Sequence, residues 1–147
     1  MQEPTFLAPH VAVCGQLKPD DLAGLAKRGF RAIVNNRPDG EAWIGQPKAA
    51  RLDEAAAEAG IASHHITFTM PTLTAEHARH FNAVLDGAEG PVLVFCASGF
   101  RSALLWAIAR AARGESIDDL LKAAAAAGQP LDKHRETIAR LAAEARG

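Results

Sequence analysis

The sequence FCASGFRS, residues 95–102, joins a short apolar run to a segment rich in alanine and leucine. Residues 91–95 are almost wholly apolar, as is typical of a parallel strand buried on both faces. Residues 103–110 have the composition of a helix. Cys96 is therefore expected at the carboxyl end of a strand, where open α/β sheets bind ligands. It is also expected beside a helix N-terminus, whose free N–H groups attract anions.

This stretch predicts a cysteine enzyme that acts on an oxyanionic substrate. A thiol in such a setting ionises easily, and the thiolate is the nucleophile. Arg101 adds a fixed positive charge with a fork of donors. We expect Cys96, Arg101 and Ser102 to be catalytic, with Ser102 supporting the thiolate. Together with Arg101, the loop residues expected to bind the anion are Ala97, Ser98, Gly99 and Phe100.

Outward from this stretch, short apolar segments alternate with helical patterns along the chain. Strands are expected near residues 11–13, 30–35, 61–68 and 91–95. Helices are expected after Pro19 and near residues 47–59, 74–87, 103–113, 117–127 and 132–145. This alternation indicates a single-domain α/β fold, with a mostly parallel sheet of about four strands and helices on both faces. Residues 1–9 are expected to form an N-terminal arm, and residues 10–146 the domain.

Composition narrows the class of protein. The 147 residues are 48% apolar and carry a net charge of -1, which fits one folded domain and gives no field that attracts nucleic acid or an acidic membrane. We expect no signal peptide, and no apolar run approaches the ~20 residues of a membrane helix. Two cysteines are too few for a disulfide framework. We therefore expect a cytoplasmic protein without nucleic-acid or membrane partners.

Three residues elsewhere are candidates for the same site. Cys14 follows the first expected strand, and it is either a resolving thiol for Cys96 or a buried core residue. Gln16 either adds a donor to the pocket or belongs to a turn. Arg37 follows the second expected strand, and it either adds positive charge at the sheet edge or pairs with Asp39 or Glu41.

The histidines do not predict a metal site. His64 and His65 are adjacent on an expected strand, so their side chains point to opposite faces. No cysteine or glutamate completes a ligand set around them. We expect neither a metal nor another cofactor.

Four short motifs together resemble the bacterial beta-lactamase hydrolase-like protein, phosphatase-like domain family. In chain order they are residues 15–17 (GQL), 35–39 (NNRPD), 96–102 (CASGFRS) and 104–106 (LLW). Their order and spacing match over roughly residues 8–145. The resemblance implies a dual-specificity-phosphatase-like fold, with Cys96 as nucleophile and Arg101 as anion ligand. Members of the family occur fused to persulfide dioxygenases and have been described both as phosphatases and as sulfurtransferases. A persulfide dioxygenase partner is thus implied, and the reaction stays open.

Set against phosphatases of this fold, the length of the catalytic loop favours sulfur transfer, and the residue before Cys96 changes how the thiolate is stabilised. Four residues separate Cys96 from Arg101, whereas these phosphatases have five. The shorter loop is similar to that of rhodaneses, which cups a single sulfur. Phe95 stands where these phosphatases have a histidine, so stabilisation of the thiolate is left to the loop amides, the helix N-terminus and Ser102.

The general acid is the third point of comparison. Release of an alkoxide or phenolate needs a proton donor, and residues 69–74, where these phosphatases place an aspartate, contain no carboxylate. The nearest candidates are Asp39 and Glu76. Sulfite and thiolate leaving groups need no acid. We therefore expect a rhodanese-like sulfurtransferase, with a persulfide carried on Cys96 and a small oxyanion or persulfide as substrate. The alternatives are a cysteine phosphatase and a non-catalytic anion-binding or partner domain.

Overall fold

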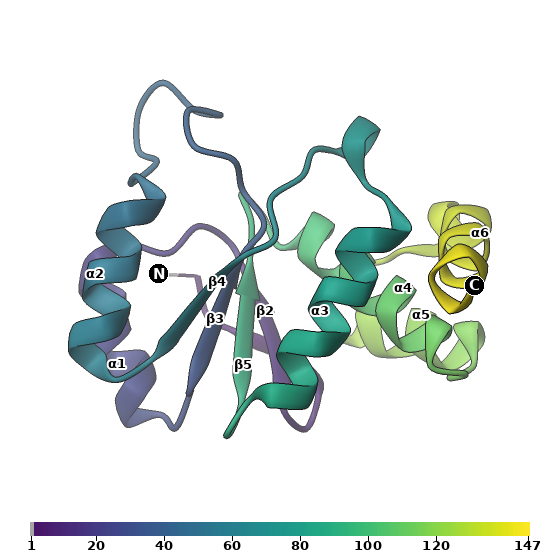
Figure 1. The fold of residues 1–147 in the computed structure, drawn as a ribbon, viewed down its shortest axis with the longest axis horizontal. Helices are drawn as coiled ribbons and strands as arrows, with labels where there is room; N and C mark the ends of the chain where they lie inside the picture. The colour runs from purple at the N-terminus through teal and green to yellow at the C-terminus, as the bar shows by residue number, and fades with distance from the viewer. Residues whose placement is uncertain (1) are drawn as a thin grey trace.

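The computed structural model describes residues 2–147, in which five short strands form one sheet (Figure 1). The strand order is β1-β2-β5-β3-β4, with β2, β5, β3 and β4 parallel and β1 antiparallel to β2. The strands are β1 (Thr5–Ala8), β2 (Val11–Cys14), β3 (Ala32–Asn35), β4 (Ala62–His65) and β5 (Val92–Phe95).

The central strand β5 aligns the ends of its two neighbours. Every residue of β5 is buried, as the apolar run predicts for a strand covered on both faces. Phe95 is paired in register with Cys14 of β2 on one side and with Asn35 of β3 on the other. Because these three strands end at one level, the segments that follow them meet at one edge of the sheet.

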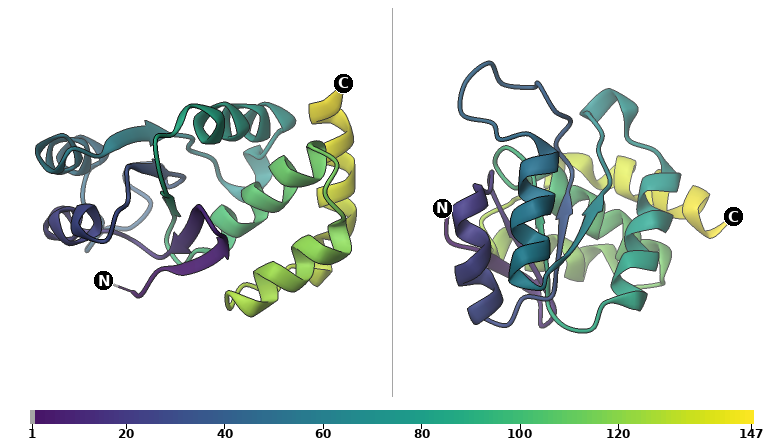
Figure 2. Two further views of the ribbon diagram at one scale, coloured as in Figure 1. Left: turned by 90° about the horizontal axis from the view of Figure 1, so that it is seen from below. Right: turned by 60° about the vertical axis from the view of Figure 1, so that its left-hand side comes forward.

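Helices cover both faces of the sheet. On one face lie α1 (Leu22–Lys27) and α2 (Ala49–Ala59), and on the other α3 (Ala75–Gly87) and α4 (Phe100–Ala112) (Figures 1 and 2). Two further helices, α5 (Ile117–Ala126) and α6 (Arg135–Arg146), pack against α4. Short 3-10 turns occupy Pro19–Asp21, Met70–Thr72 and Asp132–His134.

The helix that follows Cys96 is buried almost all round. Residues 102–109 of α4 are each buried, because the helix lies between the sheet and the outer helices. A helix this apolar belongs inside a domain. The catalytic loop is therefore held at both ends, by the central strand and by the most buried helix.

The expected α/β architecture is confirmed, with five strands instead of about four. The additional strand, β1, lies within residues 1–9, the stretch expected to be an arm. Only Leu7 of its four residues is buried, so the sequence of β1 shows no alternation that would predict a strand. The strand expected over residues 61–68 ends at His65, although Ile66 and Phe68 remain buried. Within residues 2–147, every helix is too short or too polar to cross a membrane.

Candidate active site

The turn from β5 into α4 folds around the Cys96 thiol. Gly99 N–H donates to Cys96 Sγ over 3.1 Å, and the cysteine is only 1% exposed. Gly99 makes this bend with a φ of +94°, a conformation that favours glycine. A Cβ at this position would also lie 2.7 Å from Nε2 of Gln129, which donates to the carbonyl of Ser98. The bend therefore needs a glycine for its conformation, and a Cβ here would also make the Gln129 side chain move.

The surroundings of Cys96 favour its thiolate. Burial alone opposes ionisation, yet the pKa of Cys96 lies below its ordinary value. The cause is a set of hydrogen bonds to sulfur, from the Ser102 hydroxyl and from the backbone N–H groups of Ser102, Ser98 and Gly99. The loop amides and helix start that were expected to bind an anion therefore stabilise the anionic sulfur as well.

Ser102 connects the thiol to a buried amide. Its hydroxyl donates to Asn36 Oδ1 over 2.7 Å, and Asn36 Nδ2 donates in turn to the Ile66 carbonyl. The second bond fixes the orientation of the amide, so Ser102 must be the donor in the first. A hydroxyl has one proton and rotates freely. It therefore bonds either to Asn36 or to the Cys96 sulfur, and ionisation of the thiol draws it to the sulfur.

Arg101 is held by two partners beside the loop. Its Nη1 donates to the Phe68 carbonyl at 3.1 Å and to Glu41 Oε2 at 2.6 Å. Its Nη2 donates to Glu41 Oε1 at 2.8 Å. The Glu41 carboxylate raises the pKa of Arg101, and Arg101 lowers the pKa of Glu41. A carboxylate thus occupies the fork of donors that would bind a substrate anion.

Arg37 and Gln16 extend this network along the sheet edge. Arg37 donates to Glu41 Oε1 over 3.0 Å and to Gln16 Oε1 over 2.9 Å. Gln16 spends its own N–H on the carbonyl of Leu17. Gln16 therefore orients Arg37 through its oxygen, and the N–H that it donates to Leu17 does not point to a substrate. The structure brings both sequence candidates to the edge where Arg101 lies, and Arg37 also makes the expected pair with Glu41.

Cys14 lies in the core between the sheet and helices α1 and α2. It is paired in register with Phe95, one residue before Cys96. Burial raises the pKa of Cys14 to about 12, and the nearby Cys96 charge adds to this effect. A thiol that stays protonated is a poor nucleophile. Its environment is that of the core residue, while the role of resolving thiol stays a prediction.

The two carboxylates nearest by sequence to a general-acid position are engaged elsewhere. Asp39 accepts the Ala49 N–H at the start of α2, and Glu76 pairs with Arg79 on α3. Glu41 is the carboxylate that reaches Arg101, and the sequence indicates it only as a partner of Arg37. Its position after β3, at the carboxyl edge of the sheet, is the signal that could have identified it.

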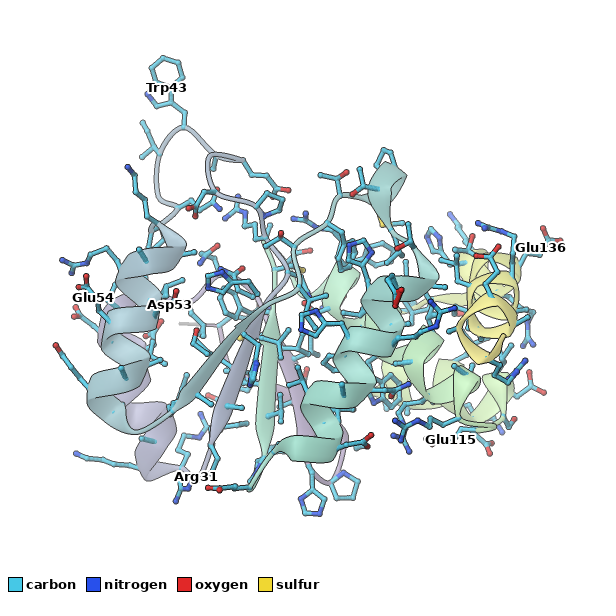
Figure 3. All side chains as sticks on the ribbon, in the orientation of Figure 1. Arg31, Trp43, Asp53, Glu54, Glu115 and Glu136 are labelled. Carbon is cyan, nitrogen blue, oxygen red and sulfur yellow. The ribbon has the colours of Figure 1, made fainter. Side chains whose placement is uncertain are left out.

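Glu41 belongs to an irregular loop that stands above this edge. The loop connects β3 to α2 and carries Trp43 at its tip (Figure 3), followed in the sequence by Ile44. Trp43 is 100% exposed and Ile44 is 85% exposed. Gln46 closes the base of the loop by accepting from Ala42 N–H and donating to the Pro38 carbonyl. One loop thus presents both the Arg101 partner and an uncovered apolar tip.

Comparison with known sequences gives a family and several relatives. The profile of the beta-lactamase hydrolase-like protein, phosphatase-like domain family matches residues 4–113. The beta-lactamase hydrolase-like protein of Xylella fastidiosa is 33% identical over 114 residues, which are 78% of this chain and 26% of that protein. The chain thus spans about a quarter of the length of the curated relatives it matches.

Comparison with solved structures also gives proteins that are named as phosphatases. A candidate phosphatase of Neisseria meningitidis is 33% identical, with a TM-score of 0.83 over 93% of this chain and 96% of that one. A kinase-associated phosphatase whose catalytic-site cysteine was replaced by serine is 13% identical, with a TM-score of 0.75 over 98% and 96%. The second likeness concerns the fold alone. These matches confirm the expected dual-specificity-phosphatase-like fold, and none of their names refers to sulfur transfer.

Proposed function

Because this chain belongs to the beta-lactamase hydrolase-like protein, phosphatase-like domain family, we propose that it is a cysteine phosphatase that hydrolyses phosphomonoesters through a Cys96 phosphoenzyme. One observation carries the proposal: a thiol with a lowered pKa lies in a turn of amide donors that continues into Arg101. The expectation of sulfur transfer gives way here, because the family and the Neisseria meningitidis structure are named for phosphatases.

The first step forms a bond between sulfur and phosphorus. The Cys96 thiolate attacks phosphorus as the bond to the ester oxygen breaks, and the leaving alcohol takes a proton. Loop N–H groups and Arg101 bind the non-bridging oxygens, where charge is concentrated. In the second step water attacks phosphorus, the P–S bond breaks, and thiolate and inorganic phosphate are released. The proton of that water passes to a nearby base.

We assign both proton transfers to Glu41. In the free protein Glu41 is ionised, since Arg101 and Arg37 lower its pKa. A phosphate bound to Arg101 would displace the carboxylate and place a second negative charge beside it. Both changes raise the pKa of a carboxyl group, which prepares Glu41 to hold a proton and donate it. The carboxylate left after step one then accepts the proton of water.

The test is turnover of p-nitrophenyl phosphate together with capture of the phosphoenzyme by intact-mass measurement after rapid quenching. We expect turnover and a phosphate adduct on Cys96, both lost in Cys96→Ser. Cys14→Ser is the matched control, because it removes the other thiol, which lies in the core between the sheet and helices α1 and α2, and it should retain activity. Turnover that persists in Cys96→Ser would refute the proposal.

Sulfur transfer is the second candidate, favoured by one specific observation. Only four residues separate Cys96 from Arg101, a loop with fewer amide donors than one with five residues between the cysteine and the arginine. The donor would be thiosulfate or a persulfide, and a persulfide dioxygenase is the partner that the family implies. Incubation with thiosulfate should then leave one added sulfur on Cys96, and cyanide should release it as thiocyanate. An unmodified Cys96 would remove this candidate.

A further inference from the structure

The peptide unit between Ser98 and Gly99 is held at both of its ends. Its N–H, on Gly99, donates to Cys96 Sγ over 3.1 Å. Its carbonyl, on Ser98, accepts from Gln129 Nε2 over 3.1 Å. The peptide bonds of residues 2–147 are trans, so the carbonyl and the N–H of one unit point in opposite directions. A donor that holds the carbonyl outward therefore aims the N–H at the sulfur.

This peptide unit needs an external partner because of the glycine within it. Gly99 has a φ of +94°, and glycine adopts positive and negative φ about equally readily. Rotation of the unit would turn the Ser98 carbonyl toward Cys96 and remove an N–H that favours the thiolate. The hydrogen bond from Gln129 opposes this rotation, because it breaks when the carbonyl turns inward.

The end of α5 fixes the position of Gln129. Gly128, which follows the helix, has a φ of +84°. The N–H groups of Gly128 and Gln129 donate to carbonyls in the last turn of α5, over 3.0 and 2.8 Å, as in a Schellman motif. Thr5 of β1 donates to the Ala127 carbonyl over 3.0 Å, which ties this helix end to the sheet. The backbone of Gln129 is thus held independently of its side-chain contact with the catalytic loop.

We propose that Gln129 is a positioning residue for the catalytic loop, holding the Ser98 carbonyl outward so that the Gly99 N–H stays directed at the Cys96 sulfur. The family profile matches residues 4–113, so this contact comes from the part of the chain that follows the matched region. The inference rests on the proposed function only in that Cys96 is the nucleophile. It does not depend on which substrate Cys96 attacks.

The thiolate fraction of Cys96, followed by ultraviolet absorbance against pH, tests the proposal. The thiolate signal is clean, because the chain has no tyrosine and burial raises the pKa of Cys14 to about 12. Gln129→Leu keeps a side chain of similar size and removes the donor without adding charge. Arg101 and Ser102, which also interact with the Cys96 charge, are unchanged in this variant. We expect the midpoint to rise, and the thiolate fraction at a fixed pH below it to fall about 2–10-fold, as loss of one hydrogen bond predicts.

A second variant separates this effect from a loss of stability. Gly60→Ala strains the left-handed residue that ends α2, where φ is +77°, so it should destabilise the fold and leave the Cys96 titration unchanged. A wild-type titration in Gln129→Leu would overturn the proposal. An equal fall in Gly60→Ala would overturn it too, because the change would then follow stability. The titration needs no substrate, so failure to hydrolyse phosphomonoesters would refute the proposed function and leave this test intact.

Discussion

Replacement of Glu41 by glutamine separates the two roles that we assign to this residue. In the free protein the Glu41 carboxylate accepts three hydrogen bonds from Arg101 and Arg37, over 2.6, 2.8 and 3.0 Å. An anion that binds Arg101 must first displace it. Glutamine keeps the size of the side chain but removes the charge, and only its oxygen accepts. The Glu41→Gln variant should therefore bind anions more tightly.

The size of this effect follows from the geometry. The bidentate pair with Arg101 is partly shielded, since 25% of the Glu41 side chain and 13% of the Arg101 side chain are exposed. Discounted for solvent screening, the pair is worth about 1–2 kcal/mol, which corresponds to about 5–30-fold in the inhibition constant of inorganic phosphate. The assay is inhibition of p-nitrophenyl phosphate turnover by phosphate. Glu76→Gln is the matched control, because Glu76 pairs with Arg79 on the surface of α3.

A second substrate tests whether Glu41 donates the proton to the leaving group. p-Nitrophenolate leaves without a proton, so Glu41→Gln should change its release little. An alkyl phosphate needs the proton, and its turnover should fall by about 10²–10⁴-fold. Weaker phosphate inhibition in Glu41→Gln would refute the competition argument, since Glu41 would then hold Arg101 in its binding position. Equal loss on both substrates in the first-step release of the alcohol, measured before the water step that also uses Glu41, would refute the acid role.

Three further predictions concern the catalytic loop. The rate of iodoacetamide alkylation of Cys96 should rise with pH, with a midpoint below that of an ordinary thiol, because the lowered pKa of Cys96 keeps the thiolate present until the pH falls below that pKa. Ser102→Ala should raise the midpoint, because it removes a hydrogen bond to the thiolate. Gly99→Ala should lower the free energy of unfolding, followed by thermal denaturation, by about 1–2 kcal/mol, because the φ of Gly99 is positive and the added Cβ contacts another side chain. Gly24→Ala is the control: Gly24 has open space and a helical backbone in α1, so this change should raise the free energy of unfolding by about 0.5–1 kcal/mol. Arg101→Lys should lower kcat/KM for p-nitrophenyl phosphate by about 10²-fold or more, since a point charge cannot replace the fork; a wild-type value would contradict its role.

The catalytic loop could be predicted from the sequence because its information is local. A buried strand, a cysteine, a glycine and a helix follow one another within residues 91–112. Parallel strands bring their carboxyl ends together, so Gln16 and Arg37 could also be placed at the same edge. The strand β1 was not predicted, because four residues of which only Leu7 is buried carry little periodicity.

The partners of the loop are long-range contacts that no local pattern contains. Glu41 is 60 residues from Arg101 along the chain, and Asn36 is 66 residues from Ser102. Asn36 is typical of a turn by composition, yet it is buried because its N–H extends the ladder to the Phe95 carbonyl. Residues 69–74 contain no carboxylate, and the carboxylate that contacts Arg101, Glu41, comes from the loop after β3.

The first strand has a consequence for how the domain behaves in solution. Without β1, the outer edge of the sheet would be β2, whose four residues are all buried and whose N–H and C=O groups would be open to another chain. In place of that template the molecule presents a four-residue strand whose register is broken by a bulge between Phe6 and Ala8. Such an irregular margin discourages edge-to-edge pairing. Residues 5–8 therefore cover the edge of β2 and leave in its place an irregular edge that disfavours pairing with a second copy of the chain.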